Sequence, residues 1–163
     1  MLRKTFEWLC DRLKNECIQV YGPNLTSLVV FGSVGRGTPT YGSDIDVLII
    51  ARQLPPGRMA RVSQFEEVEK RMAADIASAE RIGIYTRLSP LFRTESEVGS
   101  GGLIFLDMVE DAKILLDRGG FFQKYLESLR EKLQAMGAVR VRRGSTWHWV
   151  LKPDLKPGEV FEI

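Results

Sequence analysis

The spacing of apolar residues predicts a helix and two buried strands in the first third of the chain. Apolar residues recur every three or four positions over residues 2–20, which predicts an amphipathic helix that ends at the turn Tyr21–Asn24. A continuous apolar run follows at Leu28–Phe31, and a second largely apolar segment at Ile45–Ile50 contains one acidic residue, Asp46. Short apolar runs bounded by glycine or by acidic residues are typical of strands that are covered on both faces.

The middle of the chain predicts a second helix and a third strand. After a proline-containing break at residues 53–57, an apolar stripe of helical period extends to about Ala79, and most charged residues lie off it. The segment Arg81–Leu88 then predicts a strand. A path from strand to helix to strand is a right-handed crossover if the strands are parallel, and a mixed strand orientation is equally compatible with it.

The last third predicts further elements and an appended hairpin. Residues 103–109 predict a helix, residues 112–116 a strand and residues 121–136 a helix that ends at Gly137. Residues 139–150 alternate like a β-hairpin with its turn at Gly144 and Ser145. The proline-rich tail that follows carries apolar residues at its end, so we expect it to dock on the domain.

These elements together predict an α/β (α+β) fold, with a small mixed β-sheet flanked by helices and a C-terminal helix and hairpin extension. We assign residues 1–118 to the main domain and residues 119–163 to the C-terminal helix, hairpin and docked tail. The chain of 163 residues is long enough for one domain with a real core. We therefore expect the two parts to form one compact unit.

The turn at Gly32 and Ser33 is the first candidate for ligand binding. Gly32 can adopt backbone angles that are closed to other residues, and it has no side chain to hold a ligand away. Ser33 is placed to cap a short helix, and a helix start offers unpaired N–H groups to phosphate oxygens. For these two residues alone, an ordinary strand-to-helix turn with a serine cap is the simpler explanation.

Two aspartates open the second strand and make the candidate site more specific. Asp44 and Asp46 share one strand face, where their carboxylates repel each other. A divalent cation held by oxygen ligands compensates such repulsion, and two carboxylates at this spacing can converge on two Mg²⁺ ions. In the alternative, one aspartate caps loop amides and the other pairs with Arg36.

The turn and the acid pair together carry a resemblance to a known family. Gly32-Ser33, ten intervening residues and Asp44-x-Asp46 resemble the signature of the DNA polymerase β nucleotidyltransferase superfamily, above all its minimal nucleotidyltransferase (MNT) branch. The pair Arg36-Gly37 after this turn is also similar to that branch. The resemblance implies an enzyme that uses Mg²⁺ or Mn²⁺ to transfer a nucleoside monophosphate from a nucleoside triphosphate to a hydroxyl acceptor.

The resemblance also implies roles for individual residues. Asp44 and Asp46 would be catalytic metal ligands, and Gly32 and Ser33 would hold the phosphates. Arg36 would neutralise charge on the leaving pyrophosphate or pair with an aspartate. The acceptor is left open between a protein, an RNA and a small molecule.

The superfamily pattern departs from this sequence at the third strand. The resemblance implies a third carboxylate there, which would complete the metal site and deprotonate the attacking hydroxyl. The segment Arg81–Leu88 contains no acid, and the nearest acids are Glu80, Glu95 and Glu97. The alternative is therefore a catalytically weak or inactive MNT-like protein of the antitoxin type, which binds nucleotide and a partner protein.

The hairpin supports a further alternative, a nucleic-acid-binding protein. Arg140, Arg142 and Arg143 lie beside Trp147 and Trp149, and such residues can clamp a base or a single strand. In the competing interpretation, the tryptophans seal the core and the arginines are solvated. The formal net charge of +2 does not decide between them, because nonspecific binding needs a clustered basic face.

Composition and cysteine content favour a cytoplasmic protein. A hydrophobic content of 44% with 27% charged residues is ordinary for a globular chain, and no apolar segment has membrane-spanning length. Cys10 and Cys17 lie two helical turns apart, too far for a disulfide within one helix. Two cysteines and one histidine also make a zinc site unfavourable. We expect reduced cysteines and no membrane partner.

Overall fold

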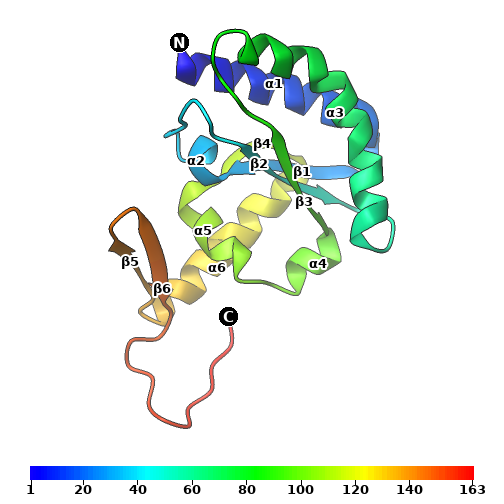
Figure 1. Ribbon diagram of the computed structural model, residues 1–163. Coiled ribbons are helices and arrows are strands. Elements are labelled where there is room, and N and C mark those ends of the chain that lie inside the picture. The colour runs from blue at the N-terminus through cyan, green and yellow to red at the C-terminus, as the bar shows by residue number, and fades with distance from the viewer.

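A four-stranded mixed sheet forms the centre of the computed structural model, which describes all residues, 1–163 (Figure 1). The strands lie in the order β3-β2-β1-β4, and β1 is antiparallel to both β2 and β4, whereas β2 and β3 are parallel. Their bounds are Leu25–Phe31 for β1, Ile45–Ala51 for β2, Leu88–Thr94 for β3 and Lys113–Asp117 for β4. The mixed sheet confirms the predicted fold class.

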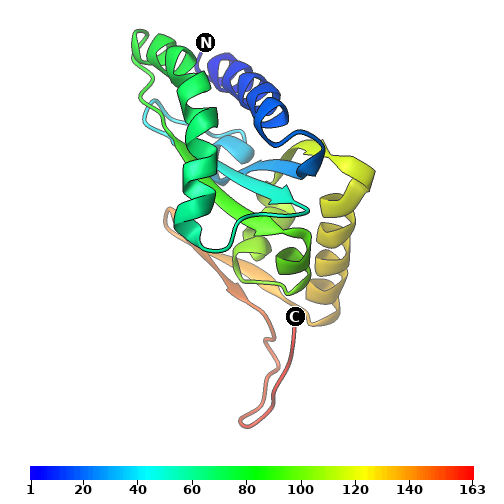
Figure 2. The same cartoon turned by 90° about the vertical axis from the view of Figure 1, so that its right-hand side faces the viewer.

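Helices cover both faces of this sheet, and Figure 2 shows α1 and α3 on one side and α6 on the other. The first layer consists of α1, Leu2–Tyr21, and α3, Arg58–Glu80. The second layer consists of α4, Glu95–Gly99, α5, Ile104–Asp111, and α6, Phe121–Ala135. Three short elements connect the strands and helices: η1, Gly22–Asn24, α2, Gly32–Gly35, and η2, Arg118–Gly120.

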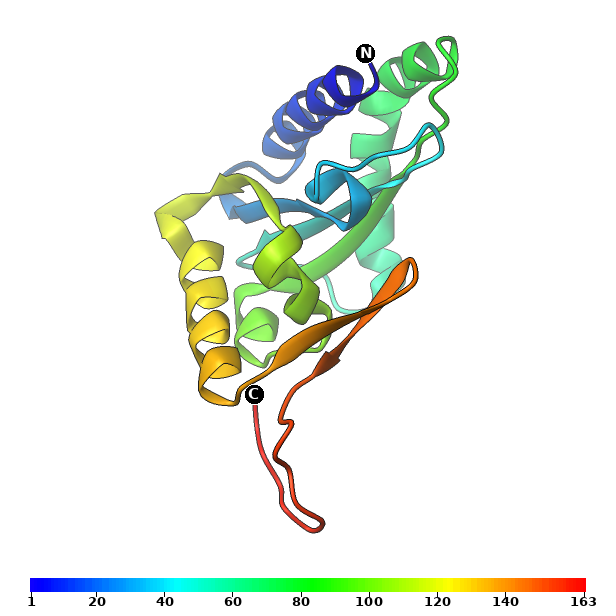
Figure 3. The ribbon, with the colours of Figure 1, turned by 90° about the vertical axis from the view of Figure 1, so that its left-hand side faces the viewer.

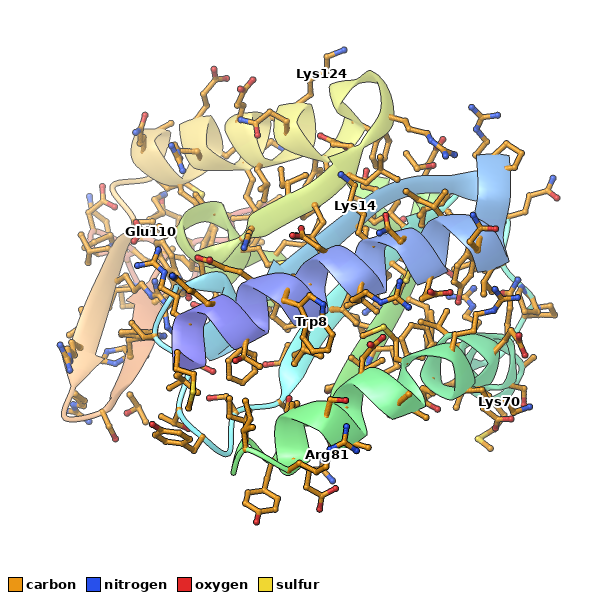
Figure 4. The ribbon with its side chains drawn as sticks, turned by 90° about the horizontal axis from the view of Figure 1, so that it is seen from above. Trp8, Lys14, Lys70, Arg81, Glu110 and Lys124 are labelled. Atoms are coloured by element: carbon orange, nitrogen blue, oxygen red, sulfur yellow. The ribbon has the colours of Figure 1, made fainter.

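The alternation of side chains along β2 divides the core into two clusters. Val47 and Ile49 pack with residues of α1 and α3, whereas Leu48 and Ile50 pack with residues of α4, α5 and α6. All four side chains are fully buried, as expected for a strand covered on both faces. Figure 4 looks down on the first layer and shows Trp8 on the side of α1 that faces α3.

The prediction of a third strand at Arg81–Leu88 is wrong, because β3 begins only at Leu88. The preceding residues form a turn in which Gly83 has a positive φ of 83° and Ile84 is a buried anchor whose amide donates to Ala79 O. The strand itself contains Pro90, two residues beyond the predicted end at Leu88. Proline is tolerated there because β3 lies at the edge of the sheet.

The C-terminal hairpin forms as predicted and extends from the end of α6 beside α5 (Figure 3). It consists of β5, Val139–Arg143, and β6, Thr146–Val150. The tail after it docks only in part: Leu151 and Ile163 pack against the second core cluster, whereas Val160 is 89% exposed. The division of the chain at residue 118 stays a prediction.

Two smaller expectations also have a structural outcome. Cys10 and Cys17 are free and buried, which confirms that they do not form a disulfide, and burial raises the pKa of the Cys10 thiol to about 11. No helix combines the length and the apolar character that crossing a membrane requires.

Candidate functional site

The glycine turn and the acid pair meet at one end of the sheet because β1 and β2 are antiparallel neighbours. The last residue of β1, Phe31, lies opposite Asp46, so the turn that follows β1 stands beside the start of β2. Gly32 has a φ of 65°, which favours glycine. A Cβ built on Gly32 would also overlap with Asp46 Oδ2. Glycine is therefore required both by the backbone and by the approach of the carboxylate.

Ser33 does not cap the helix after the turn, contrary to our prediction. The N-cap of α2 is Phe31, which makes no side-chain cap hydrogen bond. The Ser33 hydroxyl instead donates to Ser43 Oγ at 3.0 Å, and Ser43 Oγ also accepts from the Thr40 backbone amide at 2.8 Å. This serine pair ties the loop between α2 and β2 to the glycine turn.

The acid pair lies at the mouth of β2 with one carboxylate more exposed than the other. Asp44 directly precedes the strand, its side chain is 34% exposed, and its Oδ2 accepts a hydrogen bond from Arg87 Nε at 3.0 Å. Asp46 lies within the strand and is half-buried. Its pKa is raised above the ordinary value by burial and by the charge of Asp44, against the lowering effects of a Ser89 hydrogen bond and the Arg36 charge.

The strand register shows what stands beside the two aspartates in place of a third carboxylate. Asp46 lies opposite Ser89 on β3, and the Ile45 amide donates to Arg87 O, which brings Arg87 next to Asp44. The Ser89 hydroxyl of β3 and the guanidinium of Arg87, the residue before β3, thus lie beside the acid pair. No group of three histidine, cysteine, aspartate or glutamate side chains is arranged to hold a metal ion.

Arg36 pairs with neither aspartate of the acid pair, so the alternative that placed it there is wrong. Its Nη1 donates to Asp111 Oδ2 at 3.1 Å, and its guanidinium lies over the Trp147 ring, 4.9 Å from the centroid. Arg140 stacks on the same ring at 3.9 Å and donates to both carboxylate oxygens of Asp111, at 3.1 and 2.9 Å. We call Arg36, Asp111, Arg140 and Trp147 the Arg36–Trp147 cluster.

The same contacts bear on the proposed nucleic-acid surface of the hairpin. The Arg140 side chain is only 12% exposed, and the Trp149 indole donates to Asp107 Oδ1 at 3.0 Å. Glu110, which Figure 4 shows close to the hairpin, lies 3.7 Å from Arg140. Arg140 is thus engaged within the protein, whereas Arg142 and Arg143 are exposed, so the interpretation with solvated arginines is wrong only for Arg140. Trp149 packs against the second core cluster, as that interpretation predicts.

Sequence reasoning missed four residues that build this site: Ser43, Arg87, Ser89 and Asp111. The position of Ser43 directly before the acid pair was a usable signal, because a serine there can bond back to a preceding turn. No sequence pattern indicated Asp111, because an acidic residue after an apolar helical segment is an ordinary polar helix end. Arg87 was assigned to the misplaced strand, and Ser89 to the segment after it.

The arrangement offers a glycine turn, the two carboxylates of the acid pair and Arg36 at one end of a sheet. A model of the nucleotidyltransferase domain matches residues 10–97, which include the glycine turn, the acid pair and Arg36. Asp111 and the hairpin lie outside this match. The chain therefore belongs to the nucleotidyltransferase domain family, and nucleotidyl transfer is its class of chemistry. This confirms the family resemblance.

Individual proteins resemble the chain over most of its length. A relative from Methanocaldococcus jannaschii, named "Putative protein adenylyltransferase", is 26% identical over 149 residues, which cover 90% of this chain and 96% of the relative. A solved toxin–antitoxin structure with AMP-PNP is 20% identical, covers 75% of this chain and 90% of that one, and has a TM-score of 0.44. A Shewanella oneidensis structure of a tri-AMPylated HEPN toxin with MNT antitoxin is 19% identical, with coverages of 83% and 91% and a TM-score of 0.41.

Proposed function

We propose that this protein is a Mg²⁺-dependent nucleotidyltransferase that transfers a nucleoside monophosphate from a nucleoside triphosphate to a hydroxyl group. The observation that carries the proposal is the packing of Asp46 directly against Gly32, which joins the carboxylates to the glycine turn. A ligand that touches the turn with its phosphates therefore lies beside the acid pair.

The acid pair has the chemistry that a divalent cation requires. The negative charge of Asp44 is one of the causes that raise the pKa of Asp46, and a cation shared by the two carboxylates relieves this repulsion. No lysine or arginine forms an ion pair with Asp46, and Asp44 is paired only with the exposed Arg87. Mg²⁺ or Mn²⁺ bound by Asp44 and Asp46 would neutralise the triphosphate and activate the acceptor hydroxyl.

The remaining residues of the site bind and align the reactants. The turn at Gly32 and Ser33 presents its backbone to the β- and γ-phosphates, and Arg36 adds a positive charge for the pyrophosphate. The acceptor oxygen bonds to the α-phosphorus as the bond from this phosphorus to the β-phosphate oxygen breaks. Pyrophosphate leaves with the bonding electron pair, and the hydroxyl proton passes to water.

The relative from Methanocaldococcus jannaschii suggests a narrower form of the proposal. Its name describes a protein adenylyltransferase, and the similarity extends over 90% of this chain. We therefore propose ATP as the preferred donor and a protein hydroxyl as the acceptor. The acceptor would then be a serine, threonine or tyrosine side chain of a partner protein.

A second candidate function is nucleotide binding without turnover. The observation that favours it is the register of β3, which presents Ser89 and Arg87 to the acid pair where a third carboxylate would stand. Such a protein would still bind a nucleotide and a metal ion through the same residues. It would differ from the enzyme only in the rate of transfer.

Transfer of label decides between the two candidates. The purified protein is incubated with ATP labelled in the α-phosphate, Mg²⁺ or Mn²⁺, and a cell extract as the source of acceptor proteins. We expect labelled protein with the wild type and a loss of at least about a hundredfold in rate for Asp44→Asn and Asp46→Asn.

A matched control keeps the test specific to the site. Asp75→Asn removes an aspartate that forms an ion pair with Arg12 between α1 and α3, outside the candidate site, and should leave transfer intact. Nucleotide binding by the wild type without transfer to any acceptor would contradict the enzyme and favour the second candidate.

A further inference from the structure

The C-terminal hairpin lies outside the residues that the family model matches, yet it touches a residue of the proposed nucleotide site. The match covers residues 10–97, whereas Asp111, Arg140 and Trp147 come later in the chain. All three contact Arg36 directly or through one another. The hairpin therefore reaches back to the end of the glycine turn from a distant part of the sequence.

Arg36 is fixed in place by the turn and by the cluster together. Its backbone amide donates to Gly32 O at 3.0 Å, so its position depends on the same turn that approaches Asp46. Its guanidinium is held at one side by Asp111 and over its face by Trp147. A long side chain held at two points on an anchored backbone loses little further rotamer freedom when it binds a ligand.

The charges of the cluster leave Arg36 able to attract an anion. Asp111 is 6% exposed and is shared by two arginines. Arg140 has two more carboxylates nearby, Asp107 at 3.5 Å and Glu110 at 3.7 Å, whereas Arg36 has only its share of Asp111. The Arg36 side chain also stays 30% exposed. The uncompensated positive charge of the cluster thus lies on Arg36.

We propose that Trp147 is a positioning residue of the nucleotide site, which holds the Arg36 guanidinium toward the β- and γ-phosphates of a bound triphosphate. This inference rests on the proposed function, because it requires a triphosphate at the glycine turn. Asp111 and Arg140 act with Trp147. The Asp111 carboxylate orients both guanidiniums, and Arg140 also stacks on the Trp147 ring. The hairpin is then part of the phosphate site rather than an appendage.

The position of the Arg36 charge agrees with this assignment. Arg36 directly follows the short helix that begins at Gly32, and Gly32 lies against Asp46, so the field of the Arg36 charge acts at the turn beside the acid pair although no ion pair joins them. A phosphate chain between the turn and the acid pair would lie within the same field. A guanidinium released from Trp147 would be free to turn toward solvent.

The test compares two substitutions that keep the hairpin packed. Trp147→Leu preserves apolar bulk but removes the aromatic face, whereas Trp147→Phe keeps an aromatic face for the guanidinium. Binding of AMP and of an ATP analogue with a non-cleavable α–β linkage is measured by calorimetry in the presence of Mg²⁺. We expect Trp147→Leu to weaken binding of the triphosphate about three- to tenfold, with binding of AMP unchanged, and Trp147→Phe to restore most of the loss.

Two controls separate this inference from the proposed function. His148→Ala changes an exposed neighbour on β6 and should leave both affinities unchanged. Arg36→Ala should produce at least the loss seen with Trp147→Leu. If Arg36→Ala weakens triphosphate binding and Trp147→Leu does not, the positioning role is wrong while the proposed function stands. If the wild type itself does not bind the triphosphate, both are wrong.

Discussion

Arg87 is the residue whose side chain would compete most directly with a metal ion bound, as proposed, at the acid pair. Its guanidinium is bound to Asp44 in the structure, yet its side chain is 82% exposed. An exposed ion pair contributes only about 0–1 kcal/mol, so a divalent cation can displace it at little cost. The arginine thus compensates Asp44 without closing the site.

Removal of this arginine should strengthen metal binding. We expect Arg87→Ala to increase the affinity for Mn²⁺ in the absence of nucleotide by about two- to fivefold, because the cation no longer displaces a bound guanidinium. Mn²⁺ binding is measured by electron paramagnetic resonance. Arg81→Ala is the matched control, since the Arg81 guanidinium binds the Ser78 hydroxyl rather than a carboxylate. An affinity equal to or below that of the wild type would show that Arg87 does not compete for Asp44.

At the residue scale, the sequence indicated which residues form the turn and the acid pair better than it indicated the contacts around them. The spacing of Gly32 and Asp46 was readable because turn, strand alternation and acid pair follow local rules. The partners of Arg36 were not readable, since Asp111 and Trp147 reach it only through the packing of α5 and the hairpin. Contacts between distant segments depend on tertiary structure, which a local pattern does not encode.

At the scale of elements, α4 begins with a capping box. Thr94 Oγ1 accepts from the Glu97 amide at 3.1 Å, and Glu97 Oε2 accepts from the Thr94 amide at 2.9 Å. The same carboxylate binds both terminal nitrogens of Arg61 at 2.8 Å. The helix start is therefore tied to α3 across the edge of the sheet.

This contact predicts a stability that depends on pH. The hydrogen bonds from Arg61 lower the pKa of Glu97 from 4.5 to about 2. Because the pKa is lower in the folded protein, the stabilisation is complete above the unfolded value and is lost as the pH falls toward 2. Glu97→Gln keeps a capping acceptor but removes the charge, so we expect its melting temperature at pH 7 to be about 1–3 °C below that of the wild type.

Thermal unfolding over a range of pH measures this effect. The difference between wild type and Glu97→Gln should shrink as the pH falls below about 4.5, the ordinary pKa of the carboxyl group. Glu66→Gln, at an exposed position of α3, should leave the melting temperature unchanged at every pH. A constant difference for Glu97→Gln across the range would mean that the charge does not contribute.

Elements with strong periodicity were predicted well, and the edge strand was not. The long helices α1 and α3 follow apolar stripes that also meet the sheet, so local pattern and tertiary packing agree. The third strand was misplaced because Ile82 and Ile84 alternate like a strand while Pro90 looks like a break. At a sheet edge the usual rules for proline and for continuous apolar runs are relaxed.

At the scale of the whole molecule, the hairpin and tail complete the second core cluster. Trp149, Leu151 and Ile163 pack against it, and Arg140 supplies two of the three hydrogen bonds that Asp111 accepts from arginine side chains. Loss of a buried charge partner is costly because the remaining carboxylate stays desolvated. The C-terminal part thus contributes to stability as well as to the site.

Truncation after Ala138 tests this contribution. We expect the melting temperature to fall by about 5 °C or more, because Asp111 loses Arg140 and the second cluster loses part of its cover. Asp111→Asn in the truncated chain should recover part of the loss, since a neutral amide needs no cation. A truncation after Leu151 that keeps the hairpin should cost less. Equal melting temperatures for the full chain and the chain ending at Ala138 would contradict a stabilising role of the hairpin.

The contact between Arg36 and Trp147 also has a consequence for the order in which the protein is made. The glycine turn and the acid pair leave the ribosome before Trp147, which lies far later in the sequence. A nascent chain can therefore form its sheet and its carboxylate pair before Arg36 is fixed. If Trp147 positions Arg36, the protein gains its full affinity for triphosphate only after the hairpin has been made, and shorter nascent chains bind nucleotide more weakly.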